Sequence, residues 1–159
     1  MKKWKKILFV AAGIFLVAIA CFISWAYGFR QGIRAGGLTS SMAEFNLFHQ
    51  HLKNNLENAS CIGAKEALND YLKHLEKYKG VKGSFISDTI YYGDMMLTHV
   101  RLARIEEYMG NHAEAQNQIN IAKEACLQRK WEDCSYEKMV LMTKRLEERN
   151  PIGCLSSQK

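Results

Sequence analysis

The sequence predicts an all-helical protein, with an N-terminal transmembrane helix followed by a soluble bundle of about five antiparallel helices. Three observations support this prediction. Residues 7–27 carry no charge and are mostly apolar, and about 20 such residues in a helix cross the hydrocarbon core of a bilayer. Proline occurs once in the chain, at Pro151. Beyond the apolar segment, apolar side chains recur at steps of three or four, as they do on one face of a helix.

Basic residues beside the apolar segment predict its orientation. Four lysines precede the segment, whereas Arg30 and Arg34 follow it. Basic flanks are retained in the cytoplasm. We therefore expect a single-pass signal anchor in a bacterial inner membrane, with a cytoplasmic N-terminus and a periplasmic C-terminal domain. Two alternatives stay open: a signal peptide cleaved near residues 24–26, and a lipoprotein in which Cys21 is lipidated.

The apolar segment also divides the chain into four parts. Residues 1–29 form the basic flank and the transmembrane anchor, and residues 30–40 form a glycine-rich linker. Residues 41–150 form the helical domain, and residues 151–159 form a C-terminal tail with no strong structural signal except Cys154. The helical domain is large enough for one hydrophobic core.

Apolar periodicity and capping residues predict the helices of the domain. Ser60 and Ser84 stand where N-caps are favoured, Gly110 permits a tight turn, and Pro151 ends the last helix. The expected helices cover residues 41–57, 60–78, 84–109, 112–129 and 133–148.

The net charge of +6 does not indicate a nucleic-acid partner. The membrane flank holds four of the 22 basic residues, so the remaining 18 face 16 acidic residues, a net charge of +2. This is a mixed, solvated surface. Because no basic stripe with interleaved aromatic residues occurs, we expect no binding of nucleic acid.

Small residues recur every four positions at the end of the apolar segment. In a continuous helix they would form one face, and such faces let two membrane helices approach closely. Pairing of two copies through this face, giving a homo-oligomer, is one interpretation, and a flexible linker that ends the helix is the other. The residues are Ala20, Ser24, Gly28, Gly32 and Gly36.

One stretch, about residues 99–130, carries small and apolar residues at fixed spacing: Leu102, Ala103, Gly110, Ala115, Ile119 and Ala122. This spacing resembles one tetratricopeptide repeat, a helix-turn-helix unit of about 34 residues. His99 and Glu106 depart from the family pattern, since aromatic residues usually stand at both places. The resemblance implies a protein-binding module that presents a groove and has no catalytic residues. Residues 41–78 form a hairpin of similar length.

Four cysteines lie beyond the apolar segment, and an even number outside the cytoplasm predicts two disulfides. Cys126 and Cys134 stand on either side of a helical corner, so we favour a bond between them and a second bond from Cys61 to Cys154. Buried free thiols are the alternative. No CxxC motif occurs, which argues against a zinc site and against thioredoxin-like chemistry.

No catalytic or cofactor-binding motif is recognisable in the sequence. Adjacent acids at Glu106–Glu107 and at Glu147–Glu148 point in different directions on a helix, so we interpret them as solvated surface. We therefore expect no enzyme, cofactor or metal.

The function that we predict is a membrane-anchored periplasmic scaffold or protein-binding module for an envelope complex. Its partners would be the lipid bilayer and an envelope protein. A membrane-tethered cytoplasmic adaptor is one alternative. An envelope enzyme whose site is assembled from scattered residues is the other.

Overall fold

A computed structural model describes the backbone of residues 2–81 and 84–156, and the side chains of residues 13–33, 35–81 and 84–156. Over these residues the chain is helical and forms no strand, which confirms the expected all-helical class. The chain divides into two units, Met1–Ser40 and Ser41–Lys159, which are described separately below. The helices are α1 (Lys2–Asn58), α2 (Cys61–Glu76), α3 (Asp88–Tyr108), α4 (His112–Gln128), α5 (Tyr136–Glu147) and α6 (Gly153–Ser156).

The first unit is a helical stretch of α1. By length and composition, α1 is long and apolar enough to cross a membrane. Its apolar side chains from Ile14 to Phe29 are exposed. The stretch 30–40, for which the sequence left a helix-ending linker open, is helical. Added Cβ atoms at Gly28, Gly32 and Gly36 would meet no described neighbour within 4 Å, and pairing through this face stays a prediction.

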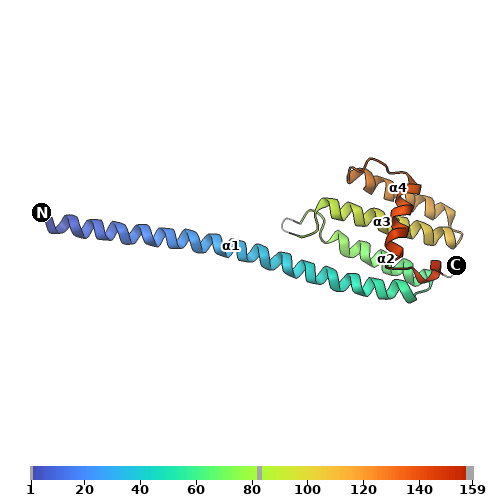
Figure 1. Ribbon diagram of the computed structural model, residues 1–159, viewed down its shortest axis with the longest axis horizontal. Coiled ribbons are helices and arrows are strands. Elements are labelled where there is room, and N and C mark those ends of the chain that lie inside the picture. Colours follow the sequence, from blue (N-terminus) through green and yellow to red (C-terminus); the bar gives the residue numbers. More distant parts are fainter. Residues whose placement is uncertain (1, 82–83, 157–159) are drawn as a thin grey trace. The chain divides into compact units, whose positions relative to one another are not determined.

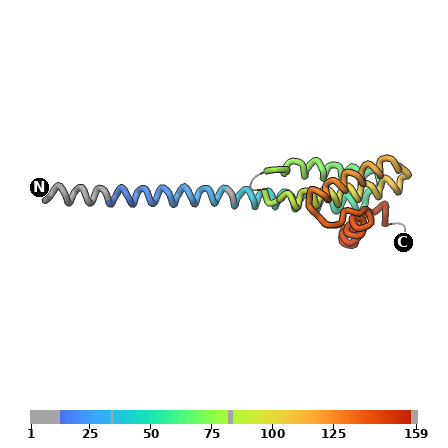
Figure 2. Tube along the Cα trace, turned by 90° about the horizontal axis from the view of Figure 1, so that it is seen from above, coloured from blue at the N-terminus to red at the C-terminus, as the bar shows by residue number. Residues whose placement is uncertain are grey.

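In the second unit, α3 is the central helix. It forms a hairpin with α4 and also contacts α2 and α5. Figure 1 shows α2, α3 and α4 side by side. In Figures 1 and 2, α5 runs crosswise to these helices instead of antiparallel to them, so the predicted antiparallel order does not extend to α5. Because α3 has neighbours on several sides, almost its whole circumference is occupied by buried side chains.

The helix ends follow local rules. The Ser60 hydroxyl accepts a hydrogen bond from the Gly63 N–H at 3.3 Å and caps α2, as predicted. Ser87 caps α3, so this helix begins later than the predicted Ser84. Gly110 ends α3 with φ +80°, and the Asn111 N–H bonds back to the Glu106 carbonyl at 2.8 Å. This is a Schellman turn, which needs a residue that tolerates positive φ.

The predicted break after α2 lies partly outside the described residues, because Lys82 and Gly83 are not described. Gly80 has φ +68° and is the last residue of the turn, residues 77–80, that follows α2.

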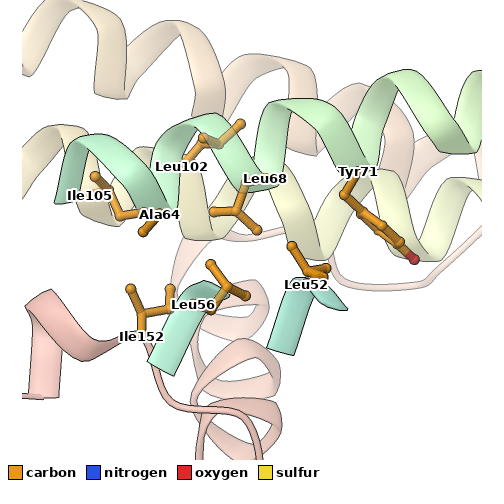
Figure 3. Close-up of a cluster of buried hydrophobic side chains, with 8 residues drawn as sticks. All are labelled: Leu52, Leu56, Ala64, Leu68, Tyr71, Leu102, Ile105 and Ile152. Atoms are coloured by element: carbon orange, nitrogen blue, oxygen red, sulfur yellow. The ribbon is translucent and has the colours of Figure 1, made fainter. Parts of the chain in front are cut away.

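The largest part of the core joins α1, α2, α3 and the C-terminal tail. Figure 3 shows these side chains converging from the four segments. Each is at least 96% buried, and together they fix the corner between α1 and α2 against α3. They are Leu52, Leu56, Ala64, Leu68, Tyr71, Leu102, Ile105 and Ile152.

The C-terminal tail is part of this core, and only the predicted Cys61–Cys154 bond had indicated that it lies against the domain. Ile152 is 2% exposed, and α6 follows it directly. A Cβ atom on Gly153 would collide with the backbone carbonyl of Glu57. Since a backbone atom cannot move aside as a flexible side chain can, the close approach of the tail to the end of α1 requires glycine here.

Two cysteine pairs stand at disulfide distance. Cys61 and Cys154 join the start of α2 to α6, with Cα atoms 5.3 Å apart. Cys126 and Cys134 join the end of α4 to the segment before α5, with Cα atoms 5.8 Å apart. These are the two pairings that the sequence favoured. Around Cys126 lies a second core cluster, which includes Met96, Val100, Ala122 and Met139.

Candidate protein-binding groove

Three helices enclose an open groove of about 250 Å³ on the surface of the helical domain. The groove is lined by side chains at the end of α2, in the first half of α3 and in the second half of α4. These helices are in contact, since α3 packs against both α2 and α4. The lining residues are Glu76, Lys79, Tyr91, Tyr92, Met95, Ile121, Glu124, Ala125 and Gln128.

Polar contacts fix one side of the groove. The Tyr91 hydroxyl donates a hydrogen bond to the Glu76 carboxylate, which joins α3 to the end of α2. Burial, followed by this bond to a carboxylate, raises the pKa of Tyr91. The Lys79 ammonium lies 5.5 Å from the centre of the Tyr91 ring, within the range of a cation–π interaction. On the other side, Glu124 projects from α4 and is exposed.

A second polar contact joins α2 and α3 close to the groove. The Tyr71 hydroxyl donates to a carboxylate oxygen of Asp94 at 2.8 Å. Burial raises the pKa of Asp94, while the bond from Tyr71 and the charges of His49 and Arg129 act in the opposite direction.

Arg129 closes the end of α4 next to α3. A Cβ atom on Gly93 would collide with the Arg129 guanidinium, so the bare backbone at this position leaves room for it. The guanidinium also lies 4.0 Å from the centre of the Trp131 ring.

Buried ion pairs hold α3 to its other neighbours. Arg101 donates to the backbone carbonyl of Asn150 at 2.8 Å and lies near the carboxylate of Glu147. Arg104 binds the same carboxylate. The sequence interpretation of Glu147 as solvated surface was therefore wrong, because its side chain is only 13% exposed.

Glu106 was misinterpreted in the same way. It is 1% exposed and pairs with Lys65 of α2 and with Asn111. Burial alone would raise the pKa of Glu106, but the bonds from Lys65 and Asn111 lower it below its usual value. A signal was present in the sequence, since Glu106 lies four residues after buried Leu102 on the same helix face.

Two buried histidines, His74 and His99, are expected to make the stability of the fold decrease at acidic pH. Burial lowers the pKa of His74, which stacks on Phe48 at 4.2 Å, with Glu44 acting in the opposite direction. Burial also lowers the pKa of His99, although its bond to Gln118 favours the charged form. The pKa of a histidine in the unfolded chain is about 6.5. As the pH falls, these two histidines are therefore protonated in the unfolded chain before they are protonated in the folded protein. The free energy of unfolding should therefore decrease between about pH 6.5 and the folded pKa values.

Urea unfolding at about pH 7.5 and about pH 5.5 measures this loss in a range where most carboxylates stay charged. Replacing both His74 and His99 with glutamine should flatten the dependence. Replacing exposed His51 with glutamine is the control and should leave it unchanged. An equally steep dependence in the double variant would exclude the buried histidines as its source.

The residues of the predicted repeat position the groove but do not line it. Ala103, Ala115, Ile119 and Ala122 are buried in the α3–α4 hairpin, and Gly110 forms its turn. Leu102 instead belongs to the core that joins α1, α2, α3 and the C-terminal tail. The sequence analysis did not identify the groove residues, because tyrosine and methionine side chains at helical spacing are typical of the edges of a helical core. Comparisons with family models, with curated proteins and with solved structures find no match.

Proposed function

We propose that this protein is a single-pass membrane protein whose helical domain lies in the periplasm and holds another envelope protein in the groove between α2, α3 and α4. The observation that carries the proposal is the placement of the four cysteines beyond residue 40 in two pairs at disulfide distance. Disulfides persist in oxidising compartments and are rare in the cytoplasm.

The N-terminal helix supports the same assignment. Its length and composition suit a membrane span, and four lysines precede the apolar segment. Basic residues at this end favour a cytoplasmic N-terminus, which directs the remainder of the chain out of the cytoplasm. The orientation of the anchor and the two disulfides thus both support a periplasmic location for the helical domain.

The hairpin of α3 and α4 supports a binding role for the domain. Small residues at Ala103 and Ala115 let the two helices lie close together, and the Schellman turn at Gly110 sets their connection. We propose that this hairpin acts as a tetratricopeptide-like unit, which buries one side and presents the other to a partner. The Tyr91–Glu76 hydrogen bond and the packing of the Tyr91 and Tyr92 rings hold one wall of the groove in place, which lowers the conformational entropy lost on binding.

In-cell photocrosslinking tests the proposal. A photoreactive amino acid in place of Tyr92 should capture a discrete envelope protein, because this residue lines the groove. The same substitution at Leu141, which is exposed on α5, is the control and should not capture that protein. Crosslinks to lipid or to many unrelated proteins at both positions would remove the support for a binding groove.

Thiol alkylation in the same cells tests the compartment. Cys61, Cys126, Cys134 and Cys154 should resist alkylation until a reductant is added. Four freely alkylated thiols would instead favour a membrane-tethered adaptor in the cytoplasm.

A further inference from the structure

We propose that the groove takes a partner segment with a basic residue, arginine or lysine, beside an aliphatic side chain. The cation would lie among the carboxylates of Glu76 and Glu124, with the aliphatic side chain against Met95 and Ile121. This inference rests on the proposed function and adds the chemistry of the partner.

The charges of the groove favour a cation. Glu76 is the last residue of α2, and Glu124 projects from α4. The two carboxylates therefore come from the two helices that flank α3. Lys79 is the only basic residue among those that line the groove. Among the described residues, Glu124 makes no hydrogen bond or ion pair, and its carboxylate is therefore available to a partner. Complementary charge speeds association and selects against partners of the wrong sign.

The apolar residues define the other half of the partner. Tyr92 and Met95 from α3 and Ile121 from α4 are all partly buried, so an aliphatic side chain can cover what remains exposed. The Tyr91 and Tyr92 rings meet edge to face at 5.1 Å, which holds both rings in place. The long stem of lysine or arginine suits such a surface, because it packs on apolar groups while its charge reaches a carboxylate.

The chain's own Lys79 shows the same chemistry within the molecule. Its ammonium lies over the Tyr91 ring, and the Tyr91 hydroxyl donates a hydrogen bond to Glu76. Lys79 is exposed and follows the end of α2, just before the turn at Gly80. A lysine in this position competes with a cation from a partner. Removing Lys79 should therefore strengthen binding, whereas a lysine that merely served a general surface role would not have this effect.

Fluorescence anisotropy with two synthetic peptides tests the inference on the full chain in zwitterionic detergent micelles. One peptide alternates leucine with arginine, and the other alternates leucine with glutamate. The arginine peptide should bind more tightly. Glu124→Gln should weaken its binding two- to fivefold, roughly the effect of one exposed ion pair. Lys79→Ala should tighten it about twofold. Added salt should weaken binding by the wild-type chain.

The matched control is Glu66→Gln. Glu66 is an exposed carboxylate on α2 that does not line this groove, so the substitution should leave the affinity unchanged. Equal binding of the glutamate peptide, equal effects of the Glu66 and Glu124 variants, or weaker binding by the Lys79 variant would each overturn the inference. If crosslinking at Tyr92 still captures an envelope protein, the proposed function stands and only the chemistry of the partner is wrong.

Discussion

Replacing Cys154 with serine should lower the free energy of unfolding by about 4.6 kcal/mol. The cysteines of this pair are separated by 93 positions in the sequence, and closing a loop of that size removes much of the entropy of the unfolded chain. The substitution also releases the tail that carries buried Ile152. Urea unfolding of the full chain in detergent micelles, followed by far-UV circular dichroism, measures the change.

The matched control is Cys134→Ser. Its disulfide spans only 8 positions, so the same entropy argument gives about 2.5 kcal/mol. Equal losses in the two variants would show that loop length does not determine the contribution of these bonds. In that case native contacts around each bond would have to account for the stability.

Replacing Glu147 with glutamine should cost about 3 kcal/mol, because it removes the charge opposite two arginines. The Arg101 side chain is 6% exposed and that of Arg104 is 20% exposed, so neither has full access to water as a substitute for the lost partner. The same urea experiment measures the cost.

Glu148 supplies the control from the next position in the chain. It is exposed, and Glu148→Gln should change the free energy of unfolding by no more than about 0.5 kcal/mol. If the two variants lost the same stability, the carboxylate of Glu147 would not be compensating the buried arginines.

The sequence predicted the features that depend on neighbouring residues. The cap at Ser60, the turn at Gly110 and the apolar stripes of α2 and α4 all follow from local rules. The start of α3 was predicted three residues too early, because serine is a favoured N-cap at Ser84 as well as at Ser87. Residues 30–40 were expected to form a linker, because glycine disfavours the helix interior by about 1 kcal/mol relative to alanine, yet these residues are helical.

Apart from the Cys61–Cys154 pairing, features that depend on distant residues could not be predicted. The tail around Ile152 is ordered by contacts with α1 and α2, and its short helix would not form alone. The burial of Glu106 could be expected from its position after Leu102, but its partner, Lys65, lies on another helix and no local pattern identifies it. The groove has the same origin, because its carboxylates come from helices whose arrangement no local pattern specifies.

The nested order of the disulfides has a consequence for synthesis. The chain is synthesised from its N-terminus. Of the four paired cysteines, Cys61 is made first, then Cys126 and Cys134, and Cys154 last. Cys126 and Cys134 can join as soon as the corner after α4 has formed, since both lie within one short stretch. Cys61 has no native partner until Cys154 has been made. The α1–α2 corner is therefore cross-linked only after Cys154 is present, and a chain truncated before Cys154 would carry one reactive thiol there.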